Sequence, residues 1–207
     1  MQFFLDMTHI GLRNPYKIGV TGGIGSGKSV VSRLLRLMGI PVYDCDSEAK
    51  RLMCCSSAVR NALIAAVGSE VYRVDGTLDR AFLSAYMFGY PERVAQVNAI
   101  VHPAVRADFE EWARLSDKAV VAVESAILFE AGMEAGVDAV WFVRAPESLR
   151  LQRAMLRDGA SDNAIRRRMQ SQMSDEQIML RADCVICNDG CSSLINQVAR
   201  LLQEAHR

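Results

Sequence analysis

Short apolar runs of strand length recur along the chain, with segments of helical periodicity between them. Such runs, nearly continuous in Val, Ile and Ala, are typical of strands that are buried on both faces of a parallel sheet. They cover residues 17–21, 40–43, 119–124, 139–143 and 184–186. Strands that alternate with helices in this way predict an α/β fold of three layers, built on a parallel five-stranded sheet.

Two further segments interrupt this alternation. Residues 54–115 are longer than one crossover requires, and they predict helices over residues 58–67, 80–88, 91–100 and 103–115. We expect this segment to be a helical insertion that contacts a second substrate. Residues 146–181 are again helical but rich in arginine, which predicts a lid. The core is then expected over residues 17–53, 116–145 and 182–207, after a leader, residues 1–16, that is extended or disordered.

Residues 22–29 read GGIGSGKS and match the full pattern of a phosphate-binding loop, G-x-x-x-x-G-K-S. A predicted strand precedes this loop and a helical pattern follows it. Glycines let backbone N–H groups turn toward a phosphate, and the next helix adds its positive N-terminal end. Lys28 is expected to reach the β- and γ-phosphates, and the Ser29 hydroxyl to hold Mg²⁺. The residues predicted to contact the triphosphate are Gly25, Ser26, Gly27, Lys28, Ser29 and Val30. These observations predict a nucleotide-binding core.

Composition narrows the possible functions. The chain of 207 residues has 24 basic and 24 acidic side chains, which argues against binding to nucleic acid or a membrane surface. Its apolar runs are too short to span a bilayer, and residues 1–16 lack the pattern of a signal peptide. Six cysteines favour reduced thiols over a zinc site, so we expect a cytoplasmic enzyme. No feature of the sequence indicates an obligatory protein partner.

Two aspartates, Asp44 and Asp46, follow the second predicted strand at the edge where doubly wound proteins bind ligands. Two residues apart in an extended segment, their carboxylates point the same way. We expect Asp46 to orient or deprotonate an acceptor hydroxyl, Asp44 to contact the acceptor, and either to reach Mg²⁺ through water. A second interpretation remains open, in which Asp46 or Ser47 caps the next helix.

Glu124 ends the third predicted strand, where many phosphate-loop proteins place an acidic residue beside the metal. It is our candidate metal ligand; a helix cap or a salt bridge is the alternative. His102 precedes a proline and is either a substrate contact or a residue at the start of a helix.

Arg153 and Arg157 are four residues apart and therefore share one helix face. A guanidinium group clamps phosphate oxygens and neutralises charge that develops during phosphoryl transfer. The alternative is a solvated basic face that pairs with nearby aspartates. The concentration of arginines in a chain of balanced charge favours a functional lid, with Arg153 as its catalytic member.

Beyond the phosphate loop, the chain resembles the dephospho-coenzyme A kinase family in an ordered set of motifs. These are TGGIGSGKS at 21–29, VYDCD at 42–46, NAIVHP at 98–103, ILFE at 127–130, LQRAMLRDG at 151–159 and ADCVICNDG at 182–190. The phosphate loop is shared by many families, whereas the ordered set is much more specific. Val30, Ala126 and Glu124 depart from the usual residues of the family, which are Thr, Pro and Asp.

The resemblance implies ATP-dependent phosphorylation of the ribose 3′-hydroxyl of dephospho-CoA, the last step to coenzyme A. The site residues that it implies are Lys28 and Ser29 on the phosphates, Asp46 at the acceptor hydroxyl, His102 by the acceptor nucleotide, Arg153 and Arg157 in the lid, and Asn188 near the adenine. The alternative is another small-molecule kinase or a nucleoside monophosphate kinase. A guanine-nucleotide switch is disfavoured because the chain has no N-K-x-D motif.

Overall fold

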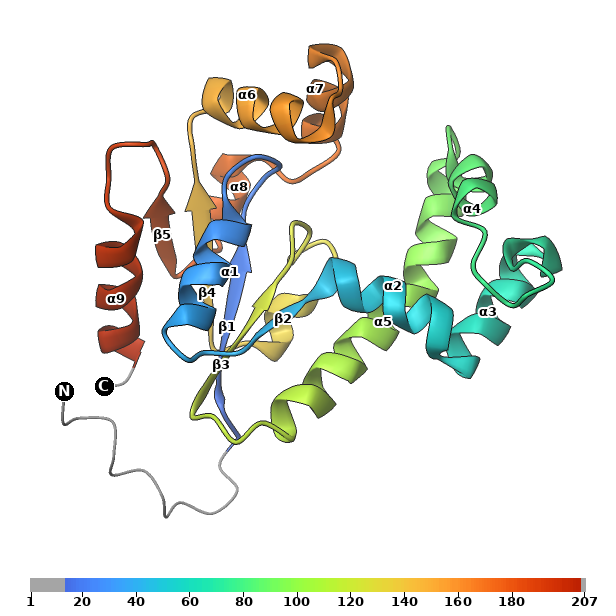
Figure 1. Cartoon of the computed structure of the whole chain (residues 1–207), viewed down its shortest axis with the longest axis horizontal. Helices are drawn as coiled ribbons and strands as arrows, with labels where there is room; N and C mark the ends of the chain where they lie inside the picture. Colours follow the sequence, from blue (N-terminus) through green and yellow to red (C-terminus); the bar gives the residue numbers. More distant parts are fainter. Residues whose placement is uncertain (1–13, 206–207) are drawn as a thin grey trace.

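The computed structural model describes residues 14–205, and its central feature is a parallel sheet of five strands (Figure 1). The strands are β1 (Tyr16–Thr21), β2 (Val42–Asp44), β3 (Val120–Glu124), β4 (Ala139–Arg144) and β5 (Cys184–Cys187). Their spatial order is β2-β3-β1-β4-β5. The predicted α/β fold and its five strands are confirmed. The leader predicted over residues 1–16 lies mostly outside the described residues, and Tyr16 already belongs to β1.

Helices cover both faces of this sheet. They are α1 (Lys28–Leu37), α2 (Cys45–Cys55), α3 (Ser57–Val67), α4 (Arg80–Met87), α5 (Pro91–Arg114), α6 (Glu147–Asp158), α7 (Asp162–Gln170), α8 (Asp175–Met179) and α9 (Leu194–Ala205). Two short 3₁₀ helices, η1 (Ser69–Val71) and η2 (Met133–Gly136), complete the described elements. No helix among residues 14–205 is long and apolar enough to cross a membrane.

Alternation along β3 explains why both faces need cover. Val120 and Ala122 belong to the core cluster that includes residues of α1 and α9, whereas Val121 and Val123 belong to the cluster on the other face. Successive side chains of a strand point to opposite faces, so the four consecutive apolar residues of β3 are buried on both. This burial fixes the register of the sheet and with it the edge where the strands end.

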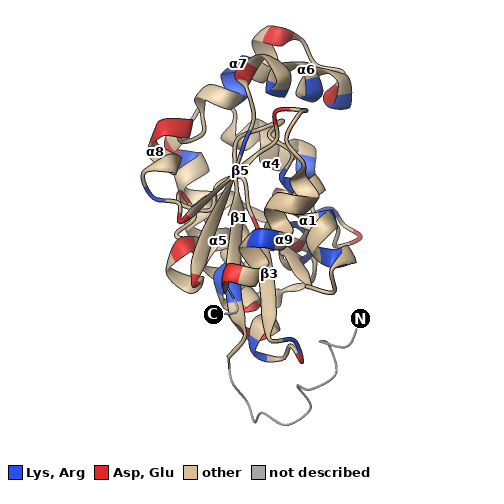
Figure 2. Cartoon of the chain, turned by 90° about the vertical axis from the view of Figure 1, so that its left-hand side faces the viewer, with Lys and Arg blue, Asp and Glu red and all other residues tan. Residues whose placement is uncertain are grey.

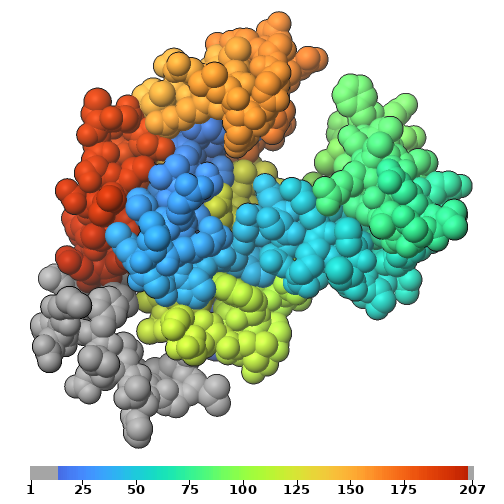
Figure 3. All heavy atoms as spheres, in the orientation of Figure 1, coloured from blue at the N-terminus to red at the C-terminus, as the bar shows by residue number. Residues whose placement is uncertain are grey.

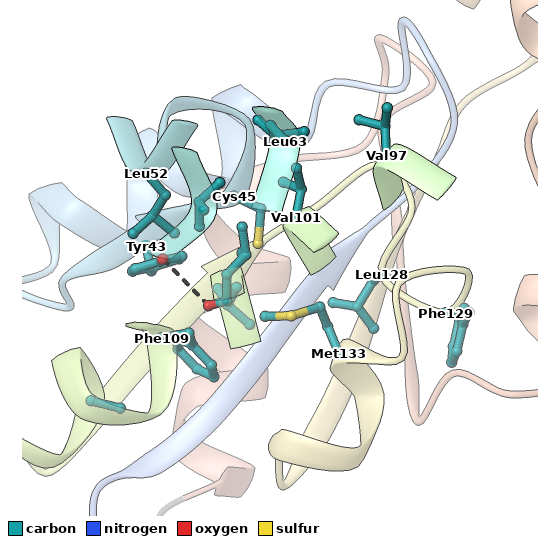
Figure 4. Close-up of a cluster of buried hydrophobic side chains, with 14 of the residues drawn as sticks. Tyr43, Cys45, Leu52, Leu63, Val97, Val101, Phe109, Leu128, Phe129 and Met133 are labelled. Atoms are coloured by element: carbon teal, nitrogen blue, oxygen red, sulfur yellow. Dashed lines mark hydrogen bonds between the residues drawn. The ribbon is translucent and has the colours of Figure 1, made fainter. Parts of the chain in front are cut away.

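The helical insertion shares its core with the sheet (Figure 4). Leu63 of α3 and Val97 and Val101 of α5 belong to the same buried cluster as Leu128, which follows β3. Tyr43 of β2 donates a hydrogen bond to the Val105 carbonyl, drawn as a dashed line in Figure 4. Because the apolar side chains are continuous, the start of α2 is held in a fixed place beside the sheet.

One predicted boundary is wrong. The sequence predicted separate helices over residues 91–100 and 103–115, but α5 runs unbroken through Pro103. Proline removes one helical N–H donor, and the carbonyl that loses it belongs to the exposed Ala99, which is accessible to water. The buried residues Val97, Val101 and Val105 keep helical spacing across this point, so packing outweighs the missing bond.

The segment predicted as a lid, residues 146–181, which we continue to call the lid, contains α6, α7 and α8 and lies at the edge where the strands end (Figure 1). Its helices carry basic and acidic residues side by side, while the sheet is almost free of charge (Figure 2). Figure 3 shows an open hollow between the lid and α4, above α2. The phosphate loop, which joins β1 to α1, is therefore reached from this hollow and from beneath the lid.

Candidate active site

The phosphate loop has the backbone shape that its glycines predict. Gly25 and Gly27 have positive φ angles of 76° and 97°. A Cβ atom at Gly25 would lie 2.2 Å from the Arg150 carbonyl oxygen, and one at Gly27 would lie 2.0 Å from Nδ2 of Asn188. Glycine is required at both places, because conformation and close packing each exclude a side chain.

Several polar groups of this loop have no partner among the described residues. No acceptor within residues 14–205 lies at hydrogen-bonding distance from the backbone N–H groups of Gly25, Gly27, Lys28 and Ser29. The Ser26 hydroxyl is buried and likewise lacks a partner in this part of the chain. Polar groups withdrawn from water are normally paired. A cradle of N–H donors at the start of a helix fits an anion such as a triphosphate.

Lys28 lies across the loop, and its Nζ donates to the Gly22 carbonyl at 2.7 Å and to the Gly23 carbonyl at 3.4 Å. Burial lowers the pKa of Lys28, while the negative charges of Glu124 and Asp46 act in the opposite direction. The structure thus brings these two carboxylates within electrostatic reach of the ammonium group, as the sequence predicted for one site.

Asp44 and Asp46 have different positions from those predicted. Helix α2 begins directly after β2, so the two aspartates do not lie in one extended segment. The Asp44 carboxylate is the helix cap, accepting from the backbone N–H of Asp46 at 3.0 Å and of Ser47 at 3.3 Å. The prediction that Asp46 or Ser47 caps this helix is wrong. The Asp46 carboxylate lies exposed in the first turn of α2 and has no hydrogen-bond partner within residues 14–205.

Glu124, at the end of β3, accepts a hydrogen bond of 2.5 Å from the buried Ser32 hydroxyl of α1. This bond holds one carboxylate oxygen and orients the other. Ser29 is exposed at the first turn of α1. In the described part of the chain, no cluster of three or more His, Cys, Asp or Glu residues forms a metal site of its own. A hydroxyl and a carboxylate are hard oxygen donors that suit Mg²⁺, which usually takes its other ligands from phosphates and water.

Arg153 and Asn188 form a connected pair beside the loop. Arg153 of α6 donates to the main-chain oxygen of Asn188 at 3.2 Å and to its Oδ1 at 3.5 Å. The buried Asn188 amide in turn donates to the Ser26 carbonyl at 2.7 Å. The structure therefore brings both residues beside the phosphate loop, and their contact with the nucleotide stays a prediction.

Two predicted residues lie further from this cluster. Arg157 is exposed and pairs with Asp158 at 2.7 Å, although its charge still contributes to lowering the pKa of Lys28. His102 is half-buried on α5, and its pKa is lowered by burial and then by the nearby charge of Arg106. None of the groups around the phosphate loop shifts the pKa of His102. Its place in the site stays a prediction.

Sequence reasoning missed two residues that contact the loop. Arg150 is buried, and its Nε donates to the Ile24 carbonyl at 3.1 Å. Gln172 accepts from the Ile24 N–H at 2.9 Å. Arg150 is three residues before Arg153, so helical spacing could have identified it as a candidate. No signal in the sequence pointed to Gln172, because it is 148 residues from its partner.

A pocket of about 690 Å³ opens under the lid. Residues of α6, α8 and the ends of β4 and β5 line it, among them Arg150, Asp175 and Asp189. Neither Lys28 nor Asp46 contributes to its wall. We therefore place the reacting groups outside this pocket, on the side of the loop that faces the hollow.

The phosphate loop follows β1 of a buried parallel sheet. Together with the arginine-rich lid, this arrangement defines a P-loop kinase. The shikimate kinase from Acinetobacter baumannii shares this fold, with a TM-score of 0.54 over 92% of both chains at 17% identity. The family model of dephospho-CoA kinase matches residues 16–193, and the chain belongs to this family. The chain is similar to the dephospho-CoA kinase of Bacteroides fragilis, with 46% identity over 187 residues, 90% of this chain and 91% of the relative. A crystal structure from Thermus thermophilus has a TM-score of 0.81 at 34% identity, covering 93% of this chain and 98% of that one.

Proposed function

We propose that this chain transfers the γ-phosphoryl group of ATP to the ribose 3′-hydroxyl of dephospho-CoA, giving coenzyme A and ADP. The observation that carries the proposal is the exposed Asp46 carboxylate, within electrostatic reach of Lys28 in a chain of the dephospho-CoA kinase family. The phosphate loop, which would bind ATP, and the candidate base Asp46 therefore lie near each other. Phosphoryl transfer needs positioning and charge neutralisation rather than covalent catalysis, and this arrangement supplies both.

On the donor side, the unpartnered N–H groups of Gly25, Gly27, Lys28 and Ser29 bind the phosphates of ATP. Lys28 neutralises charge on the β- and γ-phosphates, and it does so strongly because it is largely withdrawn from water. Arg153 brings a second cation from the lid, and Arg157 and Asn188 contact the nucleotide beside it. The lid also excludes water, which protects ATP from hydrolysis.

On the acceptor side, Asp46 orients the 3′-hydroxyl and accepts its proton. The ribose oxygen forms a bond to the γ-phosphorus while the bond between that phosphorus and the departing oxygen of ADP breaks. Asp46 has the exposure that this role requires, since its carboxylate is not used in capping α2. We assign Asp44 and His102 to contacts with the acceptor, and residues 54–115 to the acceptor-binding insertion. The Asp44 contact is secondary to its capping bonds.

The donor set of Ser29 and Glu124 fits Mg²⁺. The Ser29 hydroxyl would hold the ion directly, and the Glu124 carboxylate would reach it directly or through water. These residues would hold an ion whose charge would stabilise the phosphoryl group during its transfer. All six cysteines are unpaired, which fits a reducing compartment such as the cytoplasm.

The test is a set of parallel acceptor assays with the purified protein and Mg·ATP. Dephospho-CoA is the expected acceptor, with ADP and coenzyme A formed in equal amounts. AMP, other adenylates and shikimate serve as alternative acceptors in separate reactions. Transfer to AMP but not to dephospho-CoA would move the chain to the nucleoside monophosphate kinases and overturn the proposal.

A further inference from the structure

Ile24, in the phosphate loop, contacts the lid through its backbone N–H, its backbone carbonyl and its side chain. Its N–H donates to Oε1 of Gln172, which precedes α8, at 2.9 Å. Its carbonyl accepts from Nε of Arg150, in the first half of α6, at 3.1 Å. Its side chain packs against the small buried cluster of the lid, formed by Leu151, Ala154 and Ile165.

The two lid residues that hold this peptide are themselves fixed. The Arg150 guanidinium forms an ion pair of 2.7 Å with Asp175, the first residue of α8, and its side chain is 10% exposed. Gln172 also donates through Nε2 to the Ala126 carbonyl at 3.3 Å, so it links the loop to the segment after β3. The first and last segments of the lid are thus joined to one another and to the same peptide of the phosphate loop.

From this geometry we infer that Arg150 and Gln172 are positioning residues for ATP, which clamp the Ile24 peptide so that the phosphate loop and the base of the lid move as one unit. Neither residue needs to touch the triphosphate. Their effect on ATP passes through the orientation of the loop, because the unpartnered N–H donors of Gly25, Gly27, Lys28 and Ser29 follow Ile24 in the chain. This inference rests on the proposed binding of ATP but not on the identity of the acceptor.

Of the two hydrogen bonds that hold the Ile24 peptide, the bond from Arg150 is the stronger, because Arg150 is charged and buried. The Arg150 bond to Ile24 is charge-assisted, whereas the Gln172 bond is between neutral groups. Loss of a charge-assisted hydrogen bond costs more than loss of a neutral one. Arg150 is therefore the larger contributor. The two losses are not independent, because both residues act on a single peptide and share contacts across the lid base.

The direct test measures the dissociation constant of ATP, with Mg²⁺ present and no acceptor, by calorimetry. We expect Arg150→Met to weaken binding about tenfold and Gln172→Met severalfold. The double variant should weaken binding by less than the product of the two single effects. Arg150→Lys, which keeps a donor and the charge, should recover part of the loss. The matched control is Arg166→Met, because Arg166 forms exposed ion pairs with Glu147 and Asp162 and does not contact the loop.

A second measurement separates positioning from general stability. Exchange of the Ile24 amide hydrogen, followed by NMR, should accelerate at least tenfold in Gln172→Met at a temperature well below unfolding. The acceptor KM of both variants should stay within about twofold of the parent value.

Unchanged ATP binding and unchanged Ile24 exchange in variants that melt normally would overturn the clamp while leaving the proposed function intact. Equal weakening by Arg166→Met would also overturn it. A parent protein that binds ATP but phosphorylates no acceptor would overturn the proposed function and leave the clamp supported, and a parent that does not bind ATP would overturn both.

Discussion

The donor side and the acceptor side of the site are built differently. On the donor side, the phosphate loop is tied to the lid by hydrogen bonds through Arg150, Gln172 and Asn188. On the acceptor side, Asp46 and His102 have no side-chain hydrogen bond to residues 14–205, and the hollow between the lid and α4 is open. The proposed donor side is preorganised by the fold, whereas the residues proposed for the acceptor side are not held by such bonds. Mutations on the two sides should therefore change different kinetic constants.

The largest expected effect is that of Asp46→Asn, which removes the candidate base while preserving shape. We expect kcat to fall by about 10²- to 10⁴-fold, with ATP affinity nearly unchanged. Steady-state kinetics and calorimetry measure the two quantities. Glu48→Gln is the matched control, since Glu48 lies in the same helix and pairs with Arg51. Parallel losses of ATP binding and turnover would assign Asp46 to the donor side and would contradict the proposed difference between the two sides.

Lys28→Ala should lower kcat by about 10²- to 10³-fold, as does removal of one preorganised charge donor in a desolvated site. The acceptor KM should change little, because Lys28 lies across the phosphate loop rather than in the hollow. Initial rates at saturating ATP check this expectation. Full activity with alanine at this position would remove the basis for the proposed mechanism.

Arg153→Lys tests how far the donor side depends on a guanidinium fork. Lysine is a point charge and does not reproduce the two bonds to Asn188, so we expect the KM for ATP to rise about tenfold. Arg157→Lys is the comparison, and its effect should be smaller because Arg157 is exposed and paired with Asp158. Equal effects of the two substitutions would show that contact with Asn188 is irrelevant.

His102→Ala should raise only the acceptor KM, by a few-fold, because a neutral hydrogen bond contributes modestly. Burial and the charge of Arg106 lower the pKa of His102 below its usual 6.5, so the ring is neutral above that pH. The acceptor KM of the parent protein should therefore be flat above about pH 6.5 and change only at lower pH, as the ring gains a proton. A shift in the KM for ATP would instead assign His102 to the donor side.

How much of the site could be predicted from the sequence depends on whether the contacting residues are close together in the chain. Every donor group inside the GGIGSGKS motif was predicted, because the strand, loop and helix are contiguous and local geometry fixes them. The five strands were predicted for a similar reason, since burial on both faces leaves a local apolar pattern. Arg153 was predicted from helical spacing and from the family resemblance, Asn188 from the resemblance alone, and their mutual bond became visible only in three dimensions.

What escaped prediction depends on contacts between distant residues. The Ile24–Gln172 bond joins positions 148 residues apart, and no pattern in either segment predicts it. The bond from Ser32 to Glu124 is of the same kind, since its partners are 92 positions apart. The assignment of the α2 cap failed for a different reason. The sequence placed the cap at Asp46 or Ser47, two or three residues after Asp44, which is the cap in the structure.

The smallest effect is expected from Asp158→Asn, at the outer part of the lid. Arg157 and Arg168 hold the pKa of Asp158 at about 2, well below its usual 3.8. A carboxylate with a lowered pKa stabilises the fold fully above about pH 3.8, and this contribution is lost as the pH falls toward about 2. The variant should therefore melt slightly below the parent at pH 7, and the difference should vanish near pH 2. Its ATP affinity should stay within about twofold of the parent, because exposed ion pairs contribute little. A tenfold loss of ATP affinity in Asp158→Asn would mean that the outer lid is as tightly coupled to the phosphate loop as Arg150 is.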